Sequence, residues 1–124
     1  MIETATNKTP PNGVFPVLVH RSNEFYKKLY LIGKKINKRD KFGVWLKIEN
    51  LSVEILTHTI TVALEARAGK LPILKIISVK IEVLKKLIRT CYELNIINQK
   101  LYLDLEKDLQ ELSKMTNGWI KYLK

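Results

Sequence analysis

Residues 41–67, KFGVWLKIENLSVEILTHTITVALEAR, place apolar side chains on two sides of one predicted helix. Steps of three, four and seven residues define each stripe. The first stripe comprises Phe42, Trp45, Leu46, Val53, Leu56, Ile60 and Ala63. The second, on nearly the opposite side, comprises Ile48, Leu51, Ile55, Val62 and Ala66. A helix that is apolar around most of its circumference must be covered from more than one direction.

Helical spacing continues on both sides of this segment. It predicts a first helix over residues 19–36, a third ending near residue 94 and a fourth from about residue 98 to the C-terminus. Short connections between helices favour antiparallel neighbours. We therefore expect the 124-residue, 14.4 kDa chain to be all-α. The expected architecture is an up-down-up-down four-helix bundle over residues 15–124, behind a flexible polar tail at residues 1–14.

Helix-terminating and capping residues occupy the predicted connections. Asp40 is the expected N-cap of the second helix. Gly69 is typical of a helix C-terminus, and Pro72 of the first turn of the next helix. Asn95 can adopt the left-handed conformation that ends the third helix. The sequence also predicts a weak point in the fourth helix at residues 117–118.

The second stripe of residues 41–67 predicts an oligomer. Each helix of a four-helix monomer has an outer face, and a large apolar outer face marks an interaction surface. We therefore expect a second subunit to cover Ile48, Leu51, Ile55 and Val62. The alternative is that the N-terminal tail covers them.

Positive charge is concentrated in two predicted helices. The formal net charge is +10, from 22 basic and 12 acidic side chains. Nearly all of the excess lies in residues 15–38 and 69–94. The candidate nucleic-acid-binding residues are Lys27, Lys28, Lys34, Lys35 and Lys38 in the first helix and Lys75, Lys85, Lys86 and Arg89 in the third.

A lysine-rich helix face is usually a solvated surface. Two such faces in one small protein instead favour a polyanionic partner. Lys and Arg neutralise phosphates without reading base sequence, so binding would be non-specific and salt-sensitive. Aromatic residues that can stack on bases are few, with Tyr26, Tyr30 and Tyr92 as candidates. Nucleic acid is therefore the first expected partner, an acidic protein the second and a membrane surface the least favoured.

Catalytic and metal-binding patterns are not found in the sequence. The two histidines, His20 and His58, lie on different predicted helices, and there is no glycine-rich phosphate loop or nucleophile elbow. The single cysteine, Cys91, lies on the apolar side of its helix and excludes an intrachain disulfide, which fits a reducing cytoplasm. No signal peptide or membrane-spanning segment is predicted. We expect no enzymatic activity, no metal and no cofactor.

Two charged residues fall on apolar stripes of neighbouring helices. Lys80 and Asp108 lie about equally far from the turn near Asn95. Antiparallel packing would put them at one level, so the sequence predicts a half-buried ion pair that sets the register of the two helices.

Three motifs in residues 41–124 carry a family resemblance. The first is Lys41-Phe42-Gly43, which opens the long apolar helix ending in Ala63 and Ala66. The second is VKIEVLKKLIR at residues 79–89, and the third combines residues 102–105 with Gly118-Trp119-Ile120-Lys121. Together they resemble the accessory variability determinant (Avd) of diversity-generating retroelements. That family belongs to a wider group of four-helix bundle proteins, which includes those encoded by intervening sequences in bacterial 23S ribosomal RNA genes.

The resemblance implies a function without catalysis. Avd-type proteins form ring-shaped homopentamers and bind the reverse transcriptase and template RNA or cDNA of their element, in support of mutagenic copying and retrohoming. Lys85 and Arg89 match the family's basic pair, with Lys85 standing where Arg is usual. Three alternatives remain: an intervening-sequence-type bundle, a basic protein-interaction hub without a reverse transcriptase partner, and a metallo-enzyme bundle, for which metal analysis of the purified protein is expected to find no metal.

Overall fold

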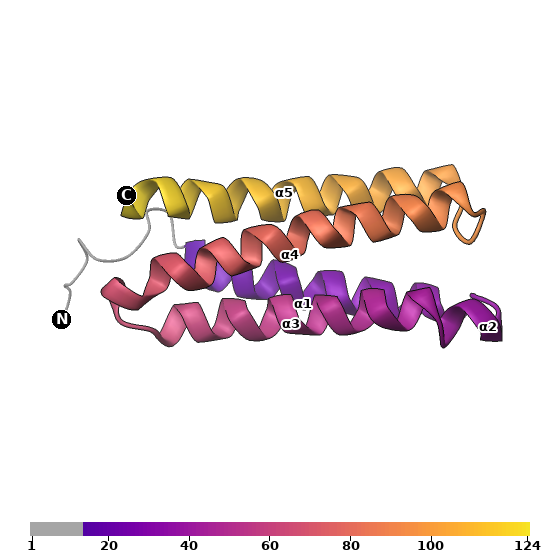
Figure 1. Cartoon of the computed structure of the whole chain (residues 1–124), viewed down its shortest axis with the longest axis horizontal. Coiled ribbons are helices and arrows are strands. Elements are labelled where there is room, and N and C mark those ends of the chain that lie inside the picture. Colours follow the sequence, from indigo (N-terminus) through magenta and orange to yellow (C-terminus); the bar gives the residue numbers. More distant parts are fainter. Residues whose placement is uncertain (1–13) are drawn as a thin grey trace.

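A computed structural model describes residues 14–124, and this part of the chain consists of helices and their connections, without strands (Figure 1). The helices are α1 (Val14–Gly33), α2 (Lys38–Lys41), α3 (Val44–Leu64), α4 (Arg67–Glu93) and α5 (Gln99–Leu123). The four long helices run up, down, up and down, and α2 is a single turn in the connection between α1 and α3. The predicted all-α four-helix bundle is confirmed. The predicted tail lies outside the described residues except for Val14, which begins α1.

The order of the helices around the bundle separates the two most basic ones. Extensive contacts join α1 to α3, α3 to α4 and α4 to α5, and a less extensive contact between α1 and α5 closes the ring. As a result, α1 and α4 lie at diagonally opposite corners. The two lysine-rich faces therefore belong to different sides of the molecule and do not merge into one surface.

The α3 side of the core follows a strict alternation of three- and four-residue steps. Its buried residues are Trp45, Ile48, Ser52, Ile55, Thr59 and Val62. The Nε1 of Trp45 donates to the carbonyl oxygen of Leu29 at 3.1 Å, and this contact ties α3 to α1. Gly33 gives the two helices room to approach, because a Cβ there would lie only 3.0 Å from that same Nε1.

This register shows that the predicted oligomer interface is wrong. Ile48, Ile55 and Val62 are buried inside their own bundle, and Leu51 is half-buried against the same core. The sequence identified this stripe but not its burial, and polar Ser52 and Thr59 lie in the buried seam between its apolar residues. A small hydroxyl is tolerated there because it bonds within its own helix, as Thr59 Oγ1 does to the Leu56 carbonyl at 2.7 Å.

The face of α3 that is exposed carries a different apolar stripe. Leu46, Val53 and Ile60 recur at seven-residue steps and are 40, 40 and 44% exposed. Phe42 and Leu64 extend the apolar surface at its two ends, 63 and 84% exposed. The prediction that this segment is apolar on more than one side therefore holds, but the second stripe is the buried one, and Trp45 of the first stripe is buried with it.

The connections confirm some predicted caps and correct others. Asn95 has a φ of 62°, the left-handed conformation that the sequence predicted. Asn98 caps α5 by accepting from the Leu101 N–H at 2.8 Å. Asp40 was the predicted N-cap of the helix that corresponds to α3, but Gly43 holds that position, and Asn37 caps the additional turn α2. The helix α4 begins at Arg67, which places Pro72 beyond its first turn, and α5 continues without a break through residues 117–118.

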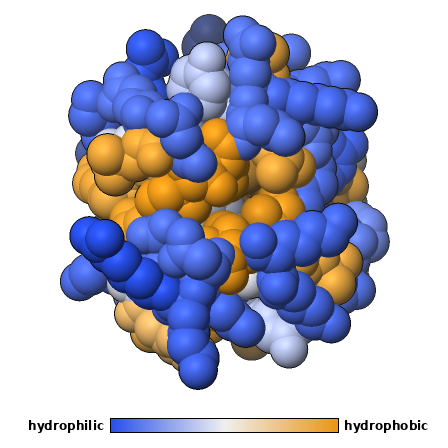
Figure 2. All heavy atoms as spheres, turned by 90° about the vertical axis from the view of Figure 1, so that its right-hand side faces the viewer, coloured by the Kyte–Doolittle hydropathy of each residue, from blue (hydrophilic) through white to orange (hydrophobic). Residues whose placement is uncertain are grey.

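One end of the bundle has an apolar centre. The connection that contains α2 and the connection between α4 and α5 meet at this end, and Figure 2 shows hydrophobic side chains in a hollow with hydrophilic ones around it.

None of the helices in residues 14–124 is long and apolar enough to cross a membrane.

Candidate functional site

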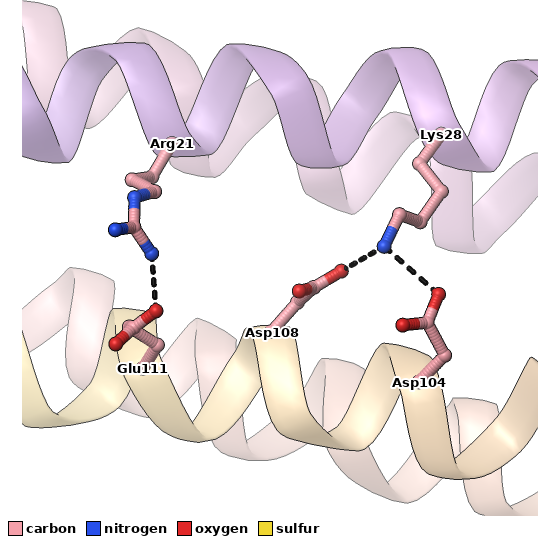
Figure 3. Close-up of polar contacts among 5 residues, drawn as sticks. All are labelled: Arg21, Lys28, Asp104, Asp108 and Glu111. Carbon is pink, nitrogen blue, oxygen red and sulfur yellow. Dashed lines mark hydrogen bonds and ion pairs between the residues drawn. The ribbon is translucent and has the colours of Figure 1, made fainter.

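Two basic residues of α1 form ion pairs with carboxylates of α5 where these helices pack together, so they are not part of a free basic surface. Lys28 Nζ lies between two carboxylates of α5, 2.9 Å from Asp104 and 2.5 Å from Asp108, and Arg21 pairs with Glu111 one to two turns away (Figure 3). Burial lowers the pKa of Lys28, but the hydrogen bonds to both aspartates outweigh it and the net shift is upward. Lys28 thus stays protonated, and the two aspartates balance its charge. It links α1 to α5 and is not available to contact a phosphate.

The predicted ion pair between Lys80 and Asp108 is wrong. Asp108 pairs with Lys28. Lys80 Nζ instead lies 2.7 Å from Glu54 Oε1 and 3.0 Å from His58 Nε2, both on α3. The two residues do belong to neighbouring helices, but Lys80 faces α3 and Asp108 faces α1. Distance from the turn predicted the level of each residue along the bundle and not the direction of its side chain.

The Lys80 ammonium can only donate, so His58 Nε2 accepts this hydrogen bond as part of a neutral imidazole. Burial, reinforced by the Lys80 charge and opposed by Glu54, lowers the pKa of His58 below its ordinary value. The folded state therefore binds fewer protons than the unfolded state in the window just below about pH 6.5. The stability contributed by neutral His58 is complete above this window and is lost as the pH falls through it.

We therefore expect His58→Gln to lose less stability than the unchanged protein when the pH falls from about 7.5 to about 5.5. Urea unfolding at several pH values measures the difference. His20→Gln, the same substitution at an exposed histidine of α1, is the matched control. Equal pH dependence in all three proteins would contradict a neutral His58.

On α4 the basic residues divide into paired and unpaired side chains. Lys85, whose side chain is 23% exposed, lies 3.3 Å from Glu82. Arg89 lies 3.3 Å from Glu93 and also donates to the Tyr102 hydroxyl at 3.3 Å. Lys75 and Lys86 are exposed, and within residues 14–124 neither has a carboxylate at ion-pair distance. Lys75 and Lys86 are therefore better placed to meet phosphates than Lys85 and Arg89, the two residues that match the basic pair of the Avd family.

Exposed basic side chains lie on α1 and, more densely, in the connection that leads from α1 to α2. Lys27 pairs with Glu24 at 3.0 Å on the same helix. Lys34 Nζ lies 5.5 Å from the ring centre of Tyr30, a cation–π contact on the exposed surface. Lys35 and Lys38 are exposed just beyond the last turn of α1.

The aromatic candidates for base stacking have different surroundings. Tyr92 stacks on Tyr102 with ring centres 4.7 Å apart and planes 5° from parallel, so its face is already used in the fold. Tyr26 and Tyr30 lie on α1 with ring centres 6.5 Å apart, and Tyr30 is half exposed.

No metal site is apparent in the part of the chain that the structure covers. Residues 14–124 contain no group of three or more His, Cys, Asp or Glu side chains that could hold an ion. Cys91 is fully buried, and burial, aided by the Asp40 charge, raises its pKa to about 11. The thiol is therefore protonated at neutral pH and suits packing, because the nucleophilic form of cysteine is the thiolate.

Two properties of the surface escaped the sequence analysis. One is the exposure of Leu46, Val53 and Ile60, which the sequence had placed on an apolar stripe but not at the oligomer interface. The other is the hollow at the end of the bundle, which had no signal because its residues come from two stretches far apart in the sequence, 31–36 and 95–101.

Comparison with known proteins agrees with the fold and with the motifs in residues 41–124. The model of the bAvd-like family matches residues 16–123, which span all four long helices. No curated protein and no solved structure matches the chain significantly. Because the family model covers nearly the whole chain, the protein belongs to the bAvd-like family.

Proposed function

We propose that this protein is a non-catalytic accessory protein of a diversity-generating retroelement. In this role it binds the element's reverse transcriptase and its template RNA or cDNA, and supports mutagenic reverse transcription and retrohoming. The observation that carries the proposal is the match to the bAvd-like family across the bundle. The unpaired lysines on the outside of α4 are consistent with a nucleic-acid partner.

The geometry of α4 suits a phosphate backbone. Lys75 and Lys86 are three helical turns apart, so they lie on the same side of α4, about 16 Å from each other along its axis. Glu82 lies between them, and its charge is offset by Lys85 at 3.3 Å. A single strand running along α4 would thus meet two available ammonium groups without an uncompensated carboxylate between them.

We expect Lys75→Ala combined with Lys86→Ala to weaken binding of single-stranded RNA about tenfold. Each lost phosphate contact should also reduce the slope of log affinity against log salt by about 0.7. Fluorescence anisotropy with a labelled RNA, repeated over a range of salt concentrations, measures both quantities.

Two double variants sharpen this test. Lys107→Ala with Lys114→Ala removes the same charge from exposed positions of α5 and should have little effect. Lys85→Ala with Arg89→Ala should weaken binding less than the first pair, because each of these side chains must leave a carboxylate to reach a phosphate. Equal losses in all three variants would indicate a diffuse effect of net charge and contradict a site on α4.

We also propose that the protein assembles as a homo-oligomer, with the ring-shaped pentamer of the Avd type as the expected form. The exposed stripe of Leu46, Val53 and Ile60 on α3 supports this proposal. It is apolar, follows a regular heptad and faces away from the bundle. The residues first assigned to this interface are needed in the core, so the exposed stripe takes their place.

The link to a reverse transcriptase has a direct test in the flanking DNA. We expect a reverse transcriptase reading frame beside the gene, together with a near-duplicate repeat that differs at adenines. A ribosomal RNA gene in that position would contradict the retroelement role and favour an intervening-sequence-type bundle.

A further inference from the structure

The hollow at the α2 end of the bundle is a concave apolar surface that the proposed function does not account for. Its volume is about 560 Å³. The walls are aliphatic side chains from the end of α1, the connection between α4 and α5, and the start of α5: Leu31, Ile32, Ile36, Ile96, Ile97 and Leu101. Figure 2 looks directly at this end, where the hydrophobic centre is open to solvent.

The backbone around the hollow is fixed by local hydrogen bonds. Asn95, with its φ of 62°, ends α4. The N–H of Ile96 donates to the carbonyl oxygen of Cys91 at 2.8 Å, and the N–H of Asn95 donates to the carbonyl oxygen of Tyr92 at 3.0 Å. This is the Schellman pattern of helix termination. Ile97 is buried in the core beside it. The hollow is thus preformed, and a ligand would not have to order its walls.

The rim of the hollow is basic. Lys35 lines it directly. In the neighbouring sequence, Lys34, Lys38 and Arg39 are exposed, and the one acidic residue of this stretch, Asp40, is engaged by the Asn37 side chain at 2.9 Å. A ligand for this end therefore meets an apolar floor framed by positive charge.

We propose that the hollow binds a short segment of a partner protein in which acidic residues flank a bulky apolar side chain. The apolar side chain would fill the aliphatic floor, and the carboxylates would meet Lys35 and its neighbours. This inference does not depend on the α4 lysines that carry the proposed nucleic-acid contact.

Charge and chemistry favour this occupant over three others. The floor has no aromatic ring among its walls on which a base could stack, which disfavours nucleic acid. Residues 1–13 of the chain contain one acidic and one basic side chain, Glu3 and Lys8, so they offer no net charge to complement the rim. A second copy of the chain already has a proposed contact surface in the exposed stripe of Leu46, Val53 and Ile60 on α3, so the hollow is not required for it.

The test uses the full chain and a fluorescein-labelled peptide, Asp-Glu-Leu-Phe-Asp-Glu, with anisotropy as the readout. A peptide with both apolar residues replaced by serine, and one with all acidic residues replaced by lysine, are the peptide controls. We expect only the first peptide to bind, with an affinity that falls as salt is added.

Two pairs of variants locate the site. Leu31→Glu places a carboxylate on the wall at a position that is 58% exposed, so it should weaken peptide binding at least about tenfold with little effect on folding. Val79→Glu makes the same change at a 63% exposed position of α4 and should have no effect. Lys35→Glu should weaken binding about fivefold, whereas Lys121→Glu, on the last turn of α5, should not.

Circular dichroism and thermal unfolding confirm that each variant is folded. Peptide binding that Leu31→Glu leaves unchanged, or that the serine peptide matches, would overturn the proposal. An RNA oligonucleotide that displaces the peptide and itself requires Leu31 would assign the hollow to nucleic acid instead. Loss of an oligomer in Leu31→Glu would assign it to a second copy. Unchanged peptide binding in the Lys75 and Lys86 double variant would show that the hollow acts separately from the proposed RNA site.

Discussion

Ile48→Ala should lower the free energy of unfolding by about 2–5 kcal/mol, the usual cost of deleting a large aliphatic side chain from a packed core. Ile48 is fully buried on the inner face of α3. Ile60→Ala makes the identical chemical change on the same helix, but Ile60 is 44% exposed. Its cost should stay below about 1 kcal/mol in the isolated bundle, because the side chain loses little burial.

Urea unfolding monitored by circular dichroism at several protein concentrations measures both effects. The loss in Ile48→Ala should not depend on concentration, since it arises inside one bundle. Any effect of Ile60→Ala should grow with concentration, because its stripe is the proposed subunit contact. The reverse ranking, with Ile60 the more costly position at high dilution, would mean that α3 is rotated so that its other face meets the core.

Val53→Asp should convert the proposed oligomer to a 14.4 kDa monomer. Val53 lies at the middle of the exposed α3 stripe and is 40% exposed in the single bundle. A carboxylate there is solvated in the monomer but would be buried without a partner between subunits, which is strongly unfavourable. The fold should survive, so the effect should appear in the mass of the particle and not in its helix content.

Size-exclusion chromatography with light scattering measures this change. Asn50→Asp adds the same charge to an exposed polar position of α3 and should leave the mass unchanged. An unaltered mass in Val53→Asp would remove the α3 stripe from the interface. A monomeric parent protein at about 50 µM would contradict the oligomer itself.

The sequence anticipated most of the bundle because the relevant signals are local. Apolar spacing located the four long helices, and short connections predicted their antiparallel order. Asn95 and Asn98 mark helix ends through hydrogen bonds made within a few residues, which explains why both were identified correctly. The motifs in residues 41–124 indicated the family that the match over residues 16–123 confirms.

Apart from the local corrections at Asp40, Pro72 and residues 117–118, the errors concern relations between helices. The analysis of α3 found two apolar stripes, but which stripe is buried depends on how the helix is rotated against α1 and α4. Ser52 and Thr59 lie in the buried seam, since a hydroxyl bonded within its own helix fits in the core. Lys80 and Asp108 were placed on adjacent helices, yet each has an opposite charge nearer to it on another helix.

The sequence alone therefore determined the helix content, the order of the helices and the family, because periodicity, capping and motif spacing are properties of short stretches of chain. Only the tertiary structure decided which face of α3 is exposed, which lysines remain without a carboxylate and where an apolar hollow opens. Those outcomes depend on side chains from different helices competing for the same space and the same charges, and their distances are fixed only when the helices pack.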